Sequence, residues 1–305
     1  MKMKFKNLEI EDKEWVEKTL SGVINSEAIF GTHFIWSKAF GSKICNYKGI
    51  FLKKSERNGI CYEFPHGASS EEAFKDAVKF VFEDSCKDGY PHLRFTELLN
   101  SEVNSLEDSF PGRFEIIPKR EKYEYLYSVE DLAFLKGKKF HKKKNHVLKF
   151  SKTYNLKYTE IDHFDSDEYM KFFEMWFKEK CEKRNYNQIP EYNAIKLALE
   201  NYKELGLLGG KIEVDGRIIA CTIGEKINDK IFLIDFEKAL ADYDGAYSAI
   251  NNEFAKSLYK RNYKLVNREE DLGIPGLRKS KLSYKPVFLV PKYEAVLKDF
   301  ENGIA

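Results

Sequence analysis

Cysteine is scarce in this chain, and its spacing excludes the sites that paired cysteines usually build. The five residues are widely separated and include no Cys-x-x-Cys pair (Cys45, Cys61, Cys86, Cys181 and Cys221). This pattern argues against a disulfide framework and against a structural zinc site. The six histidines form no His-Glu-x-x-His motif, so we expect reduced thiols and no bound metal.

Long apolar segments are absent as well. No apolar run approaches the roughly 20 residues that are needed to span a bilayer. The first residues, Met1–Phe5, lack the apolar stretch of a signal peptide. These absences predict a soluble, cytoplasmic protein without a transmembrane segment.

Neither sign of charge predominates, since 51 Lys and Arg stand against 49 Asp and Glu. An anionic partner must therefore be met by a local patch rather than by a global field. Apolar and aromatic residues are abundant, with 43% hydrophobic residues, 24 Phe and 18 Tyr, which excludes disorder by composition. A length of 305 residues is about twice the roughly 150-residue unit of a single core, so we expect two domains.

The first half of the chain predicts a mixed α+β lobe. Residues 12–20 and 71–82 repeat apolar positions at helical spacing. Strand-like segments lie between and after these helices, at 44–52, 60–64, 113–117 and 122–127.

The second half predicts two helices, an antiparallel meander and a further helix. The strands are expected at 208–214, 217–225 and 231–236, and Asp215-Gly216 between the first two is a typical two-residue hairpin turn. This order of elements is similar to that of acyl-CoA N-acyltransferase (GNAT) folds. We therefore expect an α+β protein of two tandem GNAT-like lobes, residues 1–148 and 149–305, with a substrate cleft between the lobes.

The most uneven charge lies in residues 136–152, which contain eight lysines and no acid. Lysine clusters attract phosphate by counterion release, and Phe140, Val147, Leu148 and Phe150 could anchor one side of the segment to the core. We name Lys142, Lys143, Lys144 and Asn145 as candidates for binding phosphate or another anion. The alternative is a solvated basic helix face.

A second candidate segment is the turn Asp242–Tyr247. Gly245 would allow backbone N–H groups of the following helix to face a phosphate or carbonyl oxygen. Asp242 would repel a pyrophosphate and Tyr247 would crowd it, which disfavours ordinary acetyl-CoA binding here. Alternatively, Asp244 caps a helix that only packs.

A third candidate segment, residues 267–286, follows a short apolar strand and combines donors, carboxylates and two turn-forming glycines. Arg278 and Lys281 lie three apart and share a side if the segment is helical. Such a loop suits the binding of a charged substrate, and the alternative is a surface loop whose charges neutralise one another.

These segments together resemble the phosphatidylglycerol lysyltransferase C-terminal-domain family, which shares a tandem acyltransferase-like fold with Fem-type peptidyltransferases. The resemblance rests on four blocks: 135–139 with Asn145 and His146; 223–225; 245–247; and 267–273 with Gly276, Leu277, Arg278, Lys281, Tyr284 and Pro286. In the lipid-modifying members, a related Leu-Arg-x-x-Lys-x-x-aromatic-x-Pro run lies at the active site.

The resemblance implies an acyl- or aminoacyl-transferase that moves an activated, tRNA-borne aminoacyl group to an amine or hydroxyl. Lys281 and Arg278 would stabilise the oxyanion or a phosphate. Glu269, Glu270 or Asp271 would orient the acceptor or take its proton, and we name Glu270 as the catalytic candidate. We expect substrate contacts from Asn267, Arg268, Glu269, Asp271, Tyr284, Glu225 and Tyr247, and anion contacts from Gly245 and the lysines.

We expect no permanently bound cofactor, with aminoacyl-tRNA or acyl-CoA as the donor substrate and a possible peripheral contact with anionic lipid. Two alternatives stay open. One is an acyl-CoA-dependent N-acetyltransferase, and the other is a non-catalytic module that binds an anionic ligand or RNA.

Overall fold

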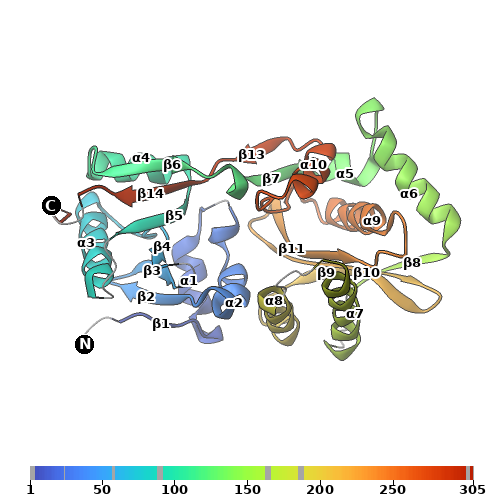
Figure 1. Cartoon of the computed structure of the whole chain (residues 1–305), viewed down its shortest axis with the longest axis horizontal. Coiled ribbons are helices and arrows are strands. Elements are labelled where there is room, and N and C mark those ends of the chain that lie inside the picture. The colour runs from blue at the N-terminus through green and yellow to red at the C-terminus, as the bar shows by residue number, and fades with distance from the viewer. Residues whose placement is uncertain are drawn as a thin grey trace. The chain divides into compact units, whose positions relative to one another are not determined.

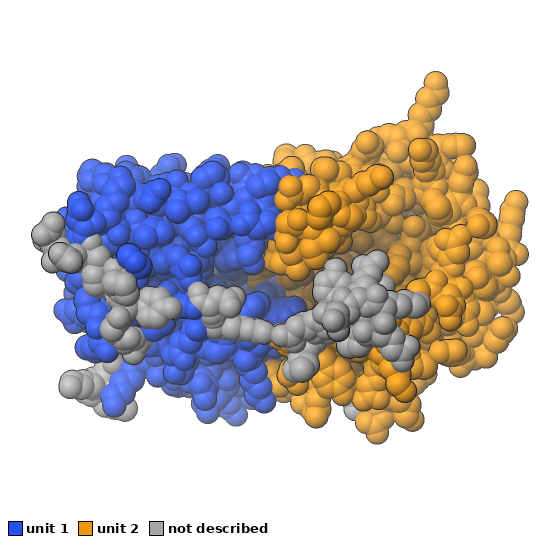
Figure 2. All heavy atoms as spheres, in the orientation of Figure 1, with its two compact units in different colours: residues 1–23, 27–124, 290–305 blue, residues 24–26, 125–289 orange. Residues whose placement is uncertain are grey.

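The computed structural model describes residues 4–23, 25–56, 59–87, 92–161, 166–184, 189–299 and 303–304. The chain divides into two compact units (Figure 2). Unit 1 comprises residues 1–23, 27–124 and 290–305, and unit 2 comprises residues 24–26 and 125–289. Within the described ranges, each unit contains one seven-stranded sheet.

In unit 1 the strands follow the order β1-β2-β3-β4-β5-β14-β6. Val78, Phe95 and Leu106 lie in the core beside this sheet and are fully buried. The strands and helices are β1 (Lys6–Asn7), α1 (Lys13–Leu20), α2 (Phe30–Phe40), β2 (Lys43–Tyr47), β3 (Ile50–Ser55), β4 (Cys61–Tyr62), α3 (Glu71–Lys87), β5 (Arg94–Leu98), α4 (Asn100–Ser109), β6 (Phe114–Pro118) and β14 (Tyr293–Leu297).

In unit 2 the strands follow the order β13-β7-β12-β11-β10-β9-β8. The elements are β7 (Glu124–Ser128), α5 (Val129–Phe134), α6 (His141–Thr153), β8 (Leu156–Glu160), α7 (Ser166–Arg184), α8 (Ile189–Glu200), β9 (Leu208–Val214), β10 (Arg217–Lys226), β11 (Ile231–Ala239), α9 (Ala246–Lys260), β12 (Leu265–Asn267), α10 (Pro275–Ser283) and β13 (Phe288–Val290). Helix α9 covers one face of this sheet, and α7 and α8 lie on the other face (Figure 1).

The predicted meander is confirmed, because β9, β10 and β11 pair antiparallel in sequence order. Asp215 and Gly216 both have positive φ, +50° and +76°, as a type I′ hairpin turn requires. The core of this unit contains Phe232, Phe254 and Val266. Burying one such Phe side chain contributes about 1.5–3 kcal/mol.

The units are bounded differently from the predicted lobes 1–148 and 149–305. A boundary after residue 148 falls inside α6, whereas the division between the units comes near residue 124. The chain also returns to unit 1 at its end, where β14 pairs with β5 and β6. The sequence pattern suggests β6 and β7 as neighbouring strands of one lobe, but the two strands belong to different sheets.

Helix α6 carries the basic segment and confirms two of its four predicted anchors. Phe140 and Phe150 are fully buried. Val147 is only half-buried, and Leu148 is 47% exposed, so the prediction that Leu148 anchors the helix is wrong. The apolar residues of α6 are too few to cover a full helix face, which leaves most of its lysines in solvent.

Among the described residues, no helix is long and apolar enough to cross a membrane. The four cysteines whose side chains are described, Cys45, Cys61, Cys86 and Cys221, are free thiols. The side chain of Cys181 lies outside the described residues. In the described part of the chain, no group of three or more His, Cys, Asp or Glu side chains is arranged to hold a metal ion.

Candidate functional site

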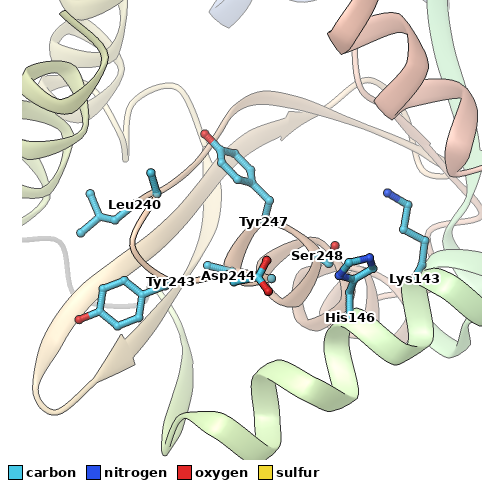
Figure 3. A pocket seen from close by; sticks show the side chains of 10 residues that line it. Lys143, His146, Leu240, Tyr243, Asp244, Tyr247 and Ser248 are labelled. Carbon is cyan, nitrogen blue, oxygen red and sulfur yellow. The ribbon is translucent and has the colours of Figure 1, made fainter. Parts of the chain in front are cut away.

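A cavity of about 310 Å³ opens in unit 2 at the N-terminal end of α9. Figure 3 shows Lys143 and His146 projecting from α6 toward the residues that begin α9. The cavity thus brings together two of the three segments predicted from the sequence, the basic segment and the glycine turn. Its lining consists of Lys143, His146, Leu240, Ala241, Tyr243, Asp244, Gly245, Ala246, Tyr247 and Ser248.

Gly245 is the N-cap of α9 and allows α6 to approach it closely. Its φ is +97°, and a Cβ atom added here would lie 3.3 Å from both the carbonyl oxygen of His146 and Cβ of Phe150. No side chain caps α9 at this end, so Asp244 is not the cap that one reading of the sequence expected. Asp244 instead forms an exposed ion pair with Lys149 at 2.8 Å. The positive end of the helix dipole therefore faces a cavity lined by lysine.

Tyr247 lines the same cavity and remains 41% exposed. Its hydroxyl accepts a hydrogen bond of 3.0 Å from Nε1 of Trp176 on α7. Tyr247 is thus held at the cavity wall, as its prediction as a substrate contact requires.

Lys143 connects the cavity to the third predicted segment. Its Nζ lies 3.8 Å from the ring centroid of Tyr284, and the Tyr284 hydroxyl is 3.1 Å from Oγ of Ser248, another cavity residue. Burial, and then the positive charge of Arg268, lower the pKa of Lys143 to about 8. All three predicted segments therefore meet in this one part of unit 2.

Arg268 provides a cation beside Tyr284, and its side chain is 15% exposed. Its guanidinium lies 5.1 Å from the ring of Tyr284 and 5.6 Å from that of Tyr127. Nη2 donates to Oε1 of Glu237 at 2.6 Å, whereas Nη1 is buried and has no hydrogen-bond partner among the described residues. A buried donor without a partner is costly, so Nη1 is a natural contact for a ligand oxygen.

Arg278, predicted as catalytic, is engaged by Asp271. Nε and Nη2 of Arg278 each donate to one oxygen of Asp271 at 2.8 Å, and Tyr125 donates to the same carboxylate at 2.5 Å. Burial by itself would raise the pKa of Asp271, but the hydrogen bonds from Arg278, Tyr125 and the backbone N–H of Gly273 hold it well below its usual range. The pair fixes the start of α10 against the loop that follows β12.

Lys281, also predicted as catalytic, holds the same loop from the last turn of α10. Its Nζ donates to the carbonyl oxygens of Arg268 and Glu269. Burial, and then the charge of Arg268, lower its pKa to about 8. The geometry therefore favours a positioning role for both Lys281 and Arg278, since each fixes backbone or side chains that surround Arg268.

The loop between β12 and α10 contains the other predicted substrate contacts. Asn267 is fully buried, and its Oδ1 accepts a hydrogen bond of 2.9 Å from the backbone N–H of Glu269. Glu269 adopts a positive φ of +53°, and Glu270 is half-buried beside it. Both carboxylates are close enough to Lys281 to raise its pKa, against the stronger effect of burial.

The structure separates the remaining lysines of the basic segment from the cavity. Lys142, Lys144 and Asn145 are exposed on α6, and none of them lines the cavity that contains Lys143. Lys144 instead borders a second hollow of about 440 Å³ with Leu135, Gly137, Lys138 and His141.

A buried carboxyl on β11 was not among the predicted site residues. Asp235 is 6% exposed, and burial, together with nearby Glu225 and Glu269, raises its pKa well above the ordinary value. A lone acid inside the apolar run 231–236 was the available signal in the sequence. Tyr127, Glu237 and Ser248 were also missed, because nothing local in the sequence distinguishes them from packing residues.

Known proteins resemble this chain over most of its length. The family described as "Phosphatidylglycerol lysyltransferase, C-terminal" matches residues 22–296. A conserved protein of unknown function from Bacteroides thetaiotaomicron is 33% identical, with a TM-score of 0.87 over 97% of this chain and 100% of that one. The C-terminal domain of a putative lysylphosphatidylglycerol synthetase from Agrobacterium fabrum is 15% identical, with a TM-score of 0.67 over 96% and 94%.

An uncharacterized protein of Mycoplasmoides gallisepticum is 24% identical over 177 residues, which cover 55% of this chain and only 54% of that protein. Two more distant structures bear on the fold. FemX is 8% identical with a TM-score of 0.64 over 96% and 97% of the chains, and a tandem GNAT protein from clavulanic acid biosynthesis is 10% identical with a TM-score of 0.51 over 97% and 98%.

These likenesses confirm the predicted fold, two tandem GNAT-like units of mixed α and β structure shared with Fem-type proteins. The family match extends over most of the chain, including all the segments that surround the cavity. The chain therefore belongs to the phosphatidylglycerol lysyltransferase C-terminal family.

Proposed function

We propose that this protein is an aminoacyltransferase that takes an activated aminoacyl ester from tRNA and passes the aminoacyl group to an amine or hydroxyl. The observation that carries the proposal is that Lys143 lines the cavity at the N-terminal end of α9 and lies, like Arg268, against the ring of Tyr284. The family and the FemX-like fold support the same class of reaction.

In the proposed reaction, the acceptor oxygen or nitrogen attacks the ester carbonyl carbon, and negative charge develops on the carbonyl oxygen. The bond between this carbon and the ribose oxygen then breaks, and that oxygen leaves with a proton. Lys143 and the end of α9 stabilise negative charge of the ester or of an adjoining phosphate. With a pKa of about 8, Lys143 is mostly protonated at neutral pH and can supply the leaving proton.

In this proposal Arg278 and Lys281 act through the loop that they fix. Arg278 holds Asp271, and Lys281 holds the backbone of Arg268 and Glu269. The role of proton acceptor is assigned to Glu270, which lies on that loop. The exposed lysines of α6, Lys142 and Lys144, supply electrostatic attraction for the tRNA backbone or an anionic lipid surface.

The test begins with tRNA charged with a mixture of isotope-labelled amino acids. The purified protein is incubated with this tRNA and with vesicles that contain phosphatidylglycerol, or with a pool of small amines and alcohols. Mass spectrometry then identifies any acceptor that gains a labelled aminoacyl group. Transfer that needs both protein and acceptor supports the proposal, and its absence with every amino acid and acceptor class contradicts it.

A matched pair of variants locates the reaction. Lys143→Gln should lower the transfer rate by about 100-fold, the usual effect of losing one preorganised donor. Lys260→Gln removes an exposed lysine at the opposite end of α9 and should leave the rate unchanged. Equal rates in the two variants would remove Lys143 from the reaction.

A further inference from the structure

A β-bulge places one carboxyl of β11 outside the regular pairing of the sheet. Ile223 pairs with Phe236 and Gly224 pairs with Ile234, so Asp235 has no partner residue on β10. Gly224 is required at this point, because a Cβ there would lie 2.0 Å from the carbonyl oxygen of Leu233. Bulges of this kind redirect a side chain and are frequent beside functional sites.

Strand β12, on the other side of β11, also has no residue paired with Asp235. The parallel pairing of β11 with β12 includes only three positions and ends at Leu233 opposite Asn267. Beyond this point β11 continues to Ala239 while β12 has ended. Asp235 therefore lies two residues beyond the point where the pairing of the two strands ends.

Two further carboxyls flank this position. Glu225 pairs with Leu233 from the β10 side, and it is 3% exposed. The last parallel pair of β11 and β12 is Leu233 with Asn267. Asp235 lies two residues after Leu233, and Glu269 lies two residues after Asn267, so the two acids occupy equivalent positions just beyond this pair. Both Glu225 and Glu269 act electrostatically on Asp235, because each disfavours its ionisation.

Neither oxygen of Asp235 has a hydrogen-bond partner among the described residues, although its side chain is only 6% exposed. A buried carboxyl without donors costs free energy in either protonation state. A cationic donor would satisfy it. A primary ammonium brings three hydrogen-bond donors and one positive charge.

We propose that Asp235, together with Glu225 and Glu269, binds the ammonium group of the aminoacyl moiety that is transferred. This inference rests on the proposed function and narrows its substrate class to acyl groups with a free amine. Simple acyl groups and N-blocked aminoacyl groups are then poor substrates. In this proposal the cations Arg268 and Lys143 serve the oxygen-rich part of the donor, while the acids serve its amine.

The test uses two non-hydrolysable donor analogues in which an aminoacyl group is joined to 3′-amino-3′-deoxyadenosine by an amide. One analogue has a free amine, and the other is N-acetylated. Isothermal titration calorimetry on the intact wild-type protein should give at least about tenfold tighter binding of the free amine, as one charge-assisted hydrogen bond supplies. Asp235→Asn should reduce this preference to about threefold or less without weakening the N-acetylated analogue.

A matched control and a second measurement separate a ligand site from a merely structural acid. Asp229→Asn alters an exposed acid in the turn before β11 and should keep the full preference. Asp235→Asn should unfold at the same temperature as wild type or higher, because the unliganded carboxyl lacks partners. A preference that survives in Asp235→Asn, or a wild type that binds both analogues equally, overturns the proposal.

If neither analogue binds the wild type, the proposed nucleoside-linked donor fails, and the ammonium site is judged separately. Ethylammonium chloride is then compared with sodium chloride at equal ionic strength. Ethylammonium should raise the unfolding temperature of wild type but not of Asp235→Asn. Equal unfolding temperatures of wild type in the two salts would overturn the ammonium site itself.

Discussion

At the scale of single residues, the site contains two kinds of charged group. Most form hydrogen bonds or ion pairs within the protein, and a few polar atoms have no hydrogen-bond partner among the described residues. Asp271 holds Arg278 through two hydrogen bonds of 2.8 Å, and Lys281 holds two backbone carbonyls. Nη1 of Arg268 and the carboxyl oxygens of Asp235 have no hydrogen-bond partner among the described residues. The paired groups fix the loop after β12, and the unpartnered groups are the ones available to a substrate.

The first prediction concerns Asp271. Asp271→Asn should lower the free energy of unfolding at pH 7 by about 2–3 kcal/mol, because it removes the charged partner of Arg278 and weakens the bond from Tyr125. The folded pKa of Asp271 is lowered, so its contribution is present above the unfolded pKa of about 3.9 and is lost as pH falls further. Urea unfolding at pH 7 and pH 3 checks this, and an equal deficit at both values would contradict it.

The second prediction concerns the pH dependence that Lys281 causes. Its pKa is about 8 in the folded protein against 10.5 for the free group, so between these values the unfolded chain binds more protons. Wild-type stability should therefore rise with pH over this range, relative to Lys281→Met, by about 1–3 kcal/mol. Lys279→Met on the same helix, where the side chain is exposed, should follow wild type. Parallel curves for wild type and Lys281→Met would show that the lysine is not perturbed.

At the scale of elements, the close approach of α6 to the start of α9 decides whether the cavity forms. Gly245 makes this approach possible because of its positive φ and its missing side chain. Gly216, in the turn between β9 and β10, also has a positive φ of +76°, but a Cβ there would meet nothing within 4 Å. A comparison of substitutions at the two glycines therefore separates the free-energy cost of backbone strain from the cost of moving α6.

The third prediction uses this pair. Gly216→Ala should cost about 1 kcal/mol from backbone strain alone, and Gly245→Ala should cost at least about 1 kcal/mol more, because α6 must move as well. Chemical denaturation measures both values. Gly245→Ala should also weaken binding of the donor analogues, whereas Gly216→Ala should not. Equal losses of unfolding free energy in the two variants would mean that α6 moves away from residue 245 without a measurable cost.

The fourth prediction separates the anchor of α6 from its charged face. Phe150→Ala should cost about 3–5 kcal/mol, since the ring is fully buried. The double variant Lys142→Gln, Lys144→Gln should change stability by no more than about 0.5 kcal/mol. It should lower the slope of log affinity for tRNA against log salt by about 0.7–0.9 for each phosphate that these lysines neutralise in the wild type. If wild type and the double variant showed the same dependence of tRNA affinity on salt, these lysines would not contact tRNA and would serve solubility only.

Local patterns in the sequence were enough for the helices and strands around the site, but not for the partners of its charged residues. The alternation in 208–236 and the Asp215-Gly216 turn fix the meander. Nothing in the spacing of Arg278 and Lys281 reveals that each is held by groups on the preceding loop, because those interactions depend on how the loop turns at Glu269. Asp235 stands out in the sequence only as the single acid of the apolar run 231–236, and the bulge that leaves it outside the strand pairing has no local pattern other than Gly224.

At the scale of the whole molecule, the described candidate residues all belong to unit 2. Unit 1 is completed by the end of the chain, since β14 lies between β5 and β6 in the first sheet. It also contains a buried ion cluster, in which Lys292 contacts Glu27 and, at 3.0 Å, Glu124. The two units thus differ in the use of their charges: unit 1 pairs these buried charges, while unit 2 leaves Asp235 and one nitrogen of Arg268 for a ligand.

The central claim is that the cavity at the start of α9 transfers an aminoacyl group. Its most direct test is a single-turnover experiment, in which excess protein is mixed with labelled aminoacyl-tRNA and the acceptor found by mass spectrometry, and label is followed from tRNA to acceptor. Transfer should slow about 100-fold in Lys143→Gln and stay at the wild-type rate in Lys260→Gln. Label that remains on tRNA with wild type, or that moves equally fast with both variants, would contradict it.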